Sequence, residues 1–130
     1  SSPSGAASQI PIGTRADLSF TVAAEDTAVS LGSGDVAVLA TPRAIAWAEA
    51  ASCAAVADLI AADLTTVGTH VAVDHLAPIW VGGHVTASAM VRQAEGRRLV
   101  FEVRVTDATG AVVLAGDVHR SIVSKERFGL

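Results

Sequence analysis

The chain is short of charged residues, aromatic residues and cysteine, and each shortage excludes a class of structure or function. Only 17% of its 130 residues are charged, 4% are aromatic and the net charge is -4. Its nine Lys and Arg residues are scattered along the chain, so we expect no nucleic-acid partner. The single cysteine, Cys53, cannot form an internal disulfide, which fits a cytoplasmic, reducing location.

A long hydrophobic run is also missing, although 51% of the residues are hydrophobic. The longest apolar stretch, residues 36–51, is interrupted by Pro42, Arg43 and Glu49. A membrane-spanning helix needs about 20 apolar residues in a row. We therefore expect no membrane partner.

The length and the composition of the first residues indicate how the chain is organised. A chain of 130 residues can bury one good core and is too short for two ordinary domains. Residues 1–14 begin with a run of Ser, Ala, Gly and Pro and are predicted to be a flexible arm, followed by a single domain over residues 15–130. The alternation of residues 17–23 predicts a first strand, and residues 25–35 read as a polar, glycine-containing loop.

A helix is predicted to begin after this loop. Thr41 is a favoured helix-capping residue, and Pro42 suits the first helical position because it has no N–H to leave unpaired. One face of a helix of about five turns is predicted to contain Ile45, Glu49, Ser52, Cys53, Val56, Leu59 and Ile60. A carboxylate on that face must be solvated by a cleft or held by a specific hydrogen-bond donor, because its unpaired burial is costly.

The rest of the chain has the period of strands. In residues 67–75 the period of two places Val67, Thr69, Val71, Val73 and His75 on one face and Gly68, His70, Ala72 and Asp74 on the other. Residues 84–92, 98–106 and 112–123 continue the pattern between glycine-containing turns, with Gly116 as a candidate bulge. The prediction is an α+β fold in which one long helix covers an antiparallel sheet.

Three side chains on these neighbouring elements have the chemistry of acyl transfer: the hydroxyl of Thr41, the carboxylate of Glu49 and the imidazole of His75. The backbone amide of Gly68 could stabilise the oxyanion of the reacting carbonyl. If the helix begins at Pro42, however, Thr41 and Glu49 lie about 12 Å apart along its axis. Three explanations stay open: the Thr41 segment folds back before a later helix start, the two residues flank the substrate, or the set is completed across a dimer.

Each of these residues also has a purely structural interpretation. Thr41 could only cap the helix, Glu49 could be a solvated or dimer-contact carboxylate, and His75 could be a satisfied histidine at the end of a strand. A metal site is not expected, because no two histidines have HxxxH spacing and His70 points away from His75. Nothing near Cys53 in the sequence would activate it as a nucleophile.

Together these segments resemble the fluoroacetyl-CoA thioesterase family of the hot-dog fold. The resemblance covers residues 15–128 and is carried by Val38-Leu-Ala-Thr41-Pro, Glu49, Val67-Gly-Thr-His70, Val73-Asp-His75, Glu95-Gly-Arg-Arg-Leu99 with Phe101, His119-Arg-Ser-Ile-Val123 and Glu126-Arg-Phe128. It implies an antiparallel sheet wrapped around a central helix and a homodimer, or a larger assembly, built by pairing sheets edge to edge. The apolar strands also carry too few charges to protect free edges.

The resemblance implies an acyl-CoA thioesterase that hydrolyses a small acyl-CoA to the free acid and CoA. Thr41, Glu49 and His75 are then the catalytic residues, while Gly68, Thr69, Leu39 and Val36 contact the substrate. No cofactor is implied, since CoA is part of the substrate. Family members that reject acetyl-CoA have phenylalanines in the lid segment before the threonine, and residues 31–39 contain no aromatic residue. The resemblance therefore implies thioester hydrolysis, and it leaves the fluorine selectivity of this chain open.

Two other functions remain open at this point. One is a non-catalytic hot-dog protein that binds a small acyl or apolar ligand. The other is a hot-dog acyl-CoA hydratase or dehydratase, although such enzymes typically use an aspartate and a histidine at the start of the helix, which this chain lacks.

Overall fold

The computed structural model describes all residues from Ser1 to Leu130. Its α-helices are α1 (Ala28–Leu31) and α2 (Thr41–Val56), and its strands are β1 (Arg15–Thr21), β2 (Leu64–His75), β3 (His84–Glu95), β4 (Arg98–Asp107) and β5 (Val112–Ser124). Short 3-10 turns lie at Ala7–Gln9, Ala24–Asp26 and Glu126–Phe128. Neither α-helix has the length and apolar character needed to cross a membrane.

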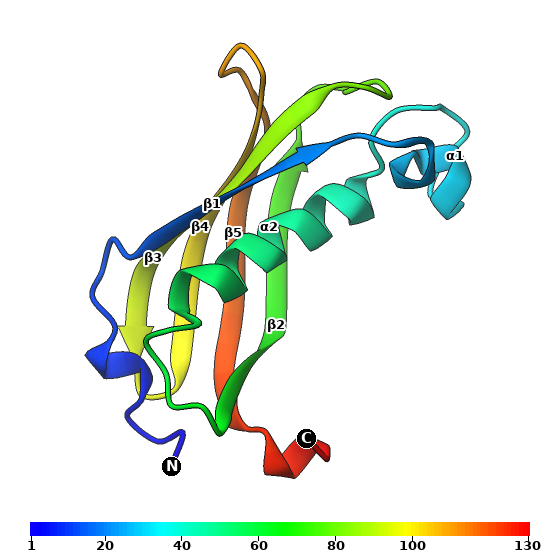
Figure 1. Ribbon diagram of the computed structural model, residues 1–130. Coiled ribbons are helices and arrows are strands. Elements are labelled where there is room, and N and C mark those ends of the chain that lie inside the picture. Colours follow the sequence, from blue (N-terminus) through cyan, green and yellow to red (C-terminus); the bar gives the residue numbers. More distant parts are fainter.

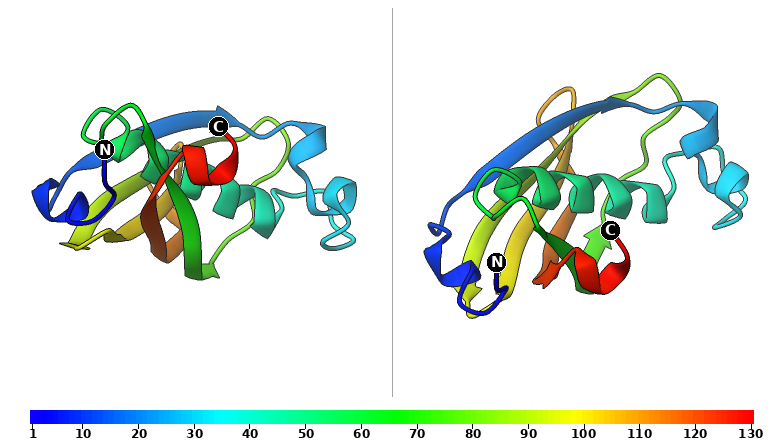
Figure 2. Two further views of the ribbon diagram at one scale, coloured as in Figure 1. Left: turned by 90° about the horizontal axis from the view of Figure 1, so that it is seen from below. Right: turned by 60° about the horizontal axis from the view of Figure 1, so that its bottom comes forward.

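The five strands form one antiparallel sheet in the order β1-β3-β4-β5-β2. The sheet curves around α2, which crosses its concave face (Figure 1, Figure 2). The predicted α+β architecture, with one long helix against an antiparallel sheet, is confirmed. Because β2 and β1 are the outermost strands, each has one side without a partner strand in the chain.

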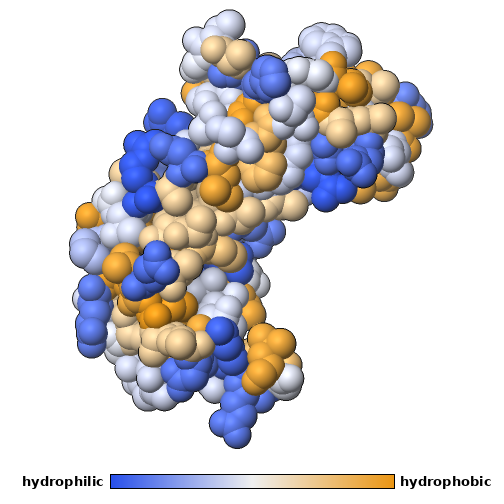
Figure 3. Space-filling model, in the orientation of Figure 1, coloured by the Kyte–Doolittle hydropathy of each residue, from blue (hydrophilic) through white to orange (hydrophobic).

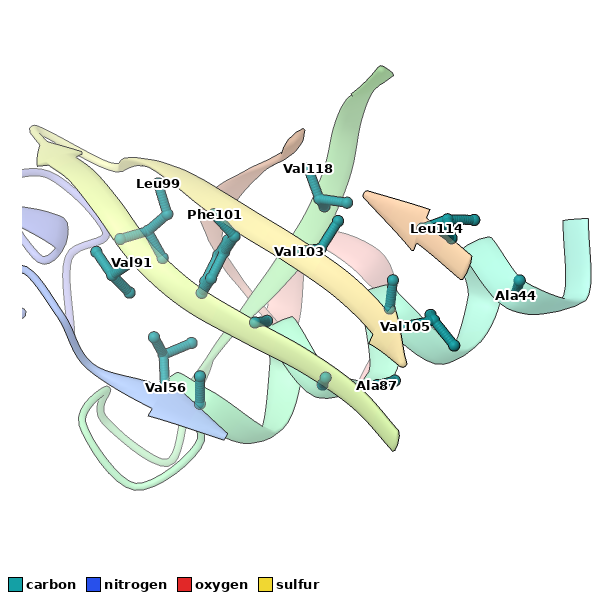
Figure 4. Packing of buried hydrophobic residues seen from close by; sticks show 14 of the residues in the cluster. Ala44, Val56, Ala87, Val91, Leu99, Phe101, Val103, Val105, Leu114 and Val118 are labelled. Atoms are coloured by element: carbon teal, nitrogen blue, oxygen red, sulfur yellow. The ribbon is translucent and has the colours of Figure 1, made fainter. Parts of the chain in front are cut away.

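The core lies between α2 and the strands β3 and β4, where every second residue is buried. Phe101 is its largest fully buried side chain, and Leu99, Val91 and Val56 pack near it (Figure 4). The helix contributes mainly small side chains: its buried residues are Ala44, Ala48, Ala51, Ser52, Ala55 and Val56. Small side chains let the helix axis approach the sheet closely, so the large residues of the core come from the strands.

The predicted buried face of the helix was therefore partly wrong. Ser52 and Val56 are buried as expected, but Ile45 is only partly buried, Cys53 is exposed and Leu59 lies beyond the end of the helix. The prediction places the large hydrophobic residues of the helix on its buried face, because they dominate the hydrophobic pattern. The face that packs closely on the sheet instead consists mainly of alanines, each of which precedes a predicted residue by one position. Glu49 consequently lies at the margin of the buried face.

The helix begins at Thr41 itself, and the predicted capping role of this residue was wrong. Ala40 occupies the N-cap position in an extended conformation, and no side chain caps the helix. The Thr41 hydroxyl instead contacts His75 at the end of β2. The helix has 16 residues and ends at Val56, slightly short of the predicted five turns.

A bulge in β2 changes which residues share a face of the sheet. The pairing of β2 with β5 slips by one residue between Gly68 and His70, so that Thr69 has no partner. Strict alternation predicts Gly68 and His75 on opposite faces, and this is wrong because the bulge shifts the phase by one residue. Both residues face α2, while His70 faces outward and lies against the ring of His119.

Other predicted boundaries moved by a few residues. The first strand spans Arg15–Thr21 rather than residues 17–23, and the predicted loop 25–35 contains α1. In the segment predicted to be a flexible arm, Ala7 and Ile10 are buried, and the Ala7 amide donates to the carbonyl of Gly96.

Gly116 pairs regularly with both of its neighbouring strands, so its predicted bulge is wrong. A side chain there would overlap the backbone of β2 at the Ala72 carbonyl. Because neither backbone can move without breaking the sheet, Gly116→Ala should lower the free energy of unfolding by about 1–3 kcal/mol. Gly34→Ala is the matched control, since its methyl group would meet only the side chain of Ala28 at 3.4 Å, and should change stability by less than about 0.5 kcal/mol. Denaturant unfolding at one protein concentration measures the free energy of unfolding of both variants. Equal values for Gly116→Ala and Gly34→Ala would contradict the close packing at Gly116.

Candidate active site

Thr41 and His75 form a direct hydrogen bond. The Thr41 Oγ1 atom lies 2.7 Å from Nδ1 of His75, and which of the two donates depends on the imidazole tautomer. The other ring nitrogen of His75, Nε2, is buried and has no hydrogen-bond partner within the chain. Buried polar atoms are nearly always paired, so Nε2 is available to a group from outside the chain.

The segment before α2 is held firmly, and this fixes the position of Thr41. The Ala40 amide donates to the carbonyl of Asp26, and the Asp26 carboxylate accepts from the amide of Ala23. Arg43, in the first turn of α2, places its Nε 3.0 Å from the same carboxylate. Thr41 is therefore presented to His75 from an anchored helix start.

A cavity of about 390 Å³ opens beside this pair. Its walls are Thr41 and His75, the residues that follow β2 (Leu76, Ala77, Pro78), and Ala28 of α1 with Ser33, Gly34, Asp35, Val36, Val38 and Leu39 of the segment after it. Most of these side chains are small or apolar, which suits the acyl part of a thioester. We call this cavity the acyl cleft.

Val36 and Leu39, the predicted acyl contacts, both line the acyl cleft, Leu39 from a fully buried position and Val36 from an exposed one. Thr69 does not reach it. Its hydroxyl donates to the carbonyl of His119, and Thr69 borders a larger hollow of about 1130 Å³ formed mainly by residues 92–100, where β3 turns into β4, and by residues 119–121 of β5. That hollow contains none of the three predicted catalytic residues.

Glu49 forms a second cluster farther along α2. Its Oε2 atom accepts a hydrogen bond of 3.1 Å from Nη1 of Arg120, which projects inward from β5. Arg120 also donates from Nε to the hydroxyl of Thr66 and from Nη2 to its carbonyl. The hydrogen-bond donor that the sequence requires for a partly buried Glu49 is thus the guanidinium of Arg120.

Gly68 lies directly beneath this carboxylate. A Cβ atom at Gly68 would be 2.6 Å from Oε2 of Glu49 and 3.4 Å from Nη1 of Arg120. The missing side chain is therefore what gives the ion pair room to lie against β2. Gly68 and Glu49, which the sequence analysis assigned to one site, are adjacent.

Within one chain the predicted set is divided. Thr41 and His75 meet at the acyl cleft, while Glu49 and Gly68 meet about 12 Å away along α2. The first of the three explanations, a later start of the helix, is excluded because α2 begins at Thr41. A substrate that spans both clusters and a site shared between two protomers both remain consistent with this arrangement.

The sequence analysis missed Arg120 and Thr66. A signal was present, since Arg120 alternates with the apolar Val118 and Ile122 and therefore has the phase of an inward-facing residue. An arginine with that phase on a strand and a glutamate on the helix face that covers the strand predict an ion pair. For metal binding, no cluster of three or more His, Cys, Asp or Glu side chains is suitably placed.

Comparison with known proteins identifies the family and the fold of the chain. The model of the family described as fluoroacetyl-CoA-specific thioesterase matches residues 22–126. A solved structure of the fluoroacetyl-CoA thioesterase FlK is 27% identical, with a TM-score of 0.86 over 92% of this chain and 93% of that one. A mutant of FlK in complex with acetyl-CoA is 26% identical, with a TM-score of 0.86 over 92% of this chain and 94% of that one.

A thioesterase superfamily member from Thermus thermophilus shares the fold at 23% identity, with a TM-score of 0.85 over 92% of this chain and 88% of that one. No curated protein sequence matches the chain. The sheet wrapped around one helix is thus the hot-dog fold, as predicted. On the extent of the family match, the chain belongs to the fluoroacetyl-CoA-specific thioesterase family and is a thioester hydrolase.

Proposed function

We propose that the protein hydrolyses a small acyl-CoA to the free acid and CoA, with Thr41, His75 and Glu49 as its catalytic residues. The observation that carries this proposal is the Thr41–His75 hydrogen bond at the wall of the acyl cleft. In this proposal the thioester carbonyl lies next to this hydroxyl and imidazole, at the polar end of the cleft. FlK, to which the chain is similar, is described as acting on fluoroacetyl-CoA, and one of its mutants binds acetyl-CoA.

In the proposed reaction Glu49 takes a proton from water as the water oxygen bonds to the thioester carbon. The carbonyl oxygen becomes an oxyanion, which the Gly68 amide stabilises and the Thr41 hydroxyl contacts. The C–S bond then breaks, and His75 protonates the departing CoA sulfur from Nε2. In an alternative route the Glu49 carboxylate itself attacks the carbonyl carbon, and the CoA thiolate leaves. Water then hydrolyses the mixed anhydride that results.

We further propose that the enzyme is a homodimer paired through the free edge of β2. The middle of this strand, residues 68–72, is exposed, and His70 is its only titratable side chain. The other edge strand, β1, carries the ion pair of Arg15 and Asp17, which protects an edge against pairing. Figure 3 shows apolar residues across the middle of the molecule, reaching the indentation on the side where Figure 1 places β2.

This pairing would reunite the divided set of catalytic residues. A twofold axis near Val71 and Ala72, midway between Gly68 and His75, places His75 of each protomer opposite Gly68 of the other. The Thr41–His75 pair of one protomer then faces Glu49 of its partner. Two equivalent sites result, each built from both chains. The exposed free cysteine also supports a reducing, cytoplasmic location for such an enzyme.

Substitution of the acid–base groups should abolish most of the activity. Glu49→Gln and His75→Ala should each lower kcat/KM by at least about 100-fold, or about 2.7 kcal/mol of transition-state stabilisation, because each removes a proton-transfer group. Thr41→Ala should lose less, since the Thr41 hydroxyl takes part only through hydrogen bonds and transfers no proton to water or to the leaving group. Release of the CoA thiol, followed with a thiol reagent, measures the rates. A folded Glu49→Gln variant with unchanged hydrolysis would reduce this carboxylate to a structural role.

A mixed dimer tests whether each site uses two chains. Glu49→Gln and His75→Ala protomers carrying different tags can be co-expressed and the heterodimer isolated. Its first site combines two intact halves and its second site combines both substitutions, so we expect about half of the wild-type activity per dimer. A heterodimer as inactive as its parents would place each complete site within one chain. A monomer by light scattering at micromolar concentration would exclude the dimer altogether.

The acyl cleft should discriminate only weakly between small acyl groups. The large apolar side chains that residues 31–39 contribute to its wall are Val36, Val38 and Leu39, and no aromatic ring is among them. Apolar pockets discriminate by about 1–3 kcal/mol for each methylene-sized difference. We expect kcat/KM for acetyl-CoA and fluoroacetyl-CoA to differ modestly, and butyryl-CoA and phenylacetyl-CoA to be accepted. A preference for the fluorinated substrate above about a thousandfold would show that selectivity has another source.

A further inference from the structure

Arg120 has no role in the reaction described so far, although it is the only buried cationic residue of the chain. Its side chain is 8% exposed and reaches Glu49 from β5, across the sheet face that α2 covers. This guanidinium is held in place independently of Glu49, because two of its nitrogens donate to the hydroxyl and the carbonyl of Thr66. Only Nη1 is directed at Glu49.

The geometry treats the two oxygens of the carboxylate differently. Oε2 accepts the bond from Arg120 and lies over Gly68, where a Cβ atom would collide with it. Oε1 accepts no hydrogen bond from the chain, and 35% of the Glu49 side chain is exposed. One oxygen is thus held by the protein and the other is left for substrate or water.

Stability alone does not account for this ion pair. Desolvation of two charges offsets most of their attraction, so a buried pair is weak evidence for stabilisation compared with apolar residues of similar volume. A planar guanidinium with two nitrogens anchored on Thr66 does restrict the rotamer of the carboxylate that its third nitrogen binds. Displacement of a reacting group by about 1 Å can cost about 100-fold in rate.

We propose that Arg120 is a positioning residue for Glu49: clamped by Thr66, it fixes Oε2 over Gly68 and directs Oε1 at the reacting water or carbonyl. This inference rests on the proposed catalytic role of Glu49. It assigns Arg120 no contact with the thioester. Its effect on the rate passes entirely through Glu49.

A double-mutant cycle tests this dependence on Glu49. Kinetic constants for hydrolysis of an accepted acyl-CoA are measured for the intact chain, Arg120→Ala, Arg120→Lys, Glu49→Gln and the double variant Glu49→Gln with Arg120→Ala. We expect Arg120→Ala to lower kcat by about 10- to 100-fold and to change KM by less than about threefold. The kcat of Arg120→Lys should lie between those of the intact chain and of Arg120→Ala, because an ammonium cannot bind Thr66 and Glu49 with the same fixed geometry.

In the Glu49→Gln background the same Arg120→Ala substitution should cost less than about threefold, because the group that it positions is already gone. Arg92→Ala is the matched control: Arg92 also forms an ion pair, with Asp117, but on the outer face of the sheet, and its loss should leave kcat unchanged. Denaturant unfolding of every variant shows which are folded. If Arg120→Ala does not fold, the cycle is run with Arg120→Lys.

Two results would overturn the proposal. One is a folded Arg120 variant that has the same kcat as the intact chain, although Glu49→Gln has a lower kcat. This result would refute the role of Arg120 and would not affect the proposed function. The other is a double variant whose loss equals the product of the two single losses, because Arg120 would then act independently of Glu49. Unimpaired Glu49→Gln would instead refute the catalytic role of Glu49, which identifies a failure of the proposed function itself.

Discussion

The close contact between α2 and the concave face of the sheet is the constraint on which the rest of the structure depends. Alanines at positions 44, 48, 51 and 55 make this contact, and the strands supply the bulk of the core behind it. The same helix carries Thr41 in its first turn and Glu49 two turns later, so its placement on the sheet determines which strand residues each can meet. Thr41 meets His75 at the end of β2, and Glu49 meets Arg120 of β5 above Gly68.

The bulge at Thr69 is the second determinant of the site. Without it, the separation of seven residues from Gly68 to His75 would place these two residues on opposite faces of the sheet. With it, both face α2, and one strand serves both clusters of functional residues. The extra residue is accommodated on the exposed edge, where Thr69 lacks a partner in the pairing with β5 and its side-chain hydroxyl bonds to the His119 carbonyl of that strand.

The two clusters have different characters. Thr41 and His75 form the polar end of a largely apolar cleft. Nε2 of His75 has no hydrogen-bond partner in the chain and is free to bind a group from outside it. Glu49, by contrast, is held at Oε2 by Arg120, in the space that the missing side chain of Gly68 leaves. On the proposed mechanism, the imidazole serves as the proton donor to the leaving group and the carboxylate acts at the reacting carbon. The aliphatic segment 31–39 leaves the choice of acyl group to the size of the cleft.

The sequence by itself determined the order of the elements, the single long helix, the antiparallel strands and the residue types of the site, because these follow from local periodicity, turn residues and the chemistry of individual side chains. The alternation in β5 already indicated that Arg120 faces inward. Three features were decided only by the tertiary structure: the shared face of Gly68 and His75, the hydrogen bond of Thr41 to His75 in place of a capping role, and the alanine face of α2. Each depends on a register shift, or on a contact between residues far apart in the chain, and the period of one segment contains no information about either.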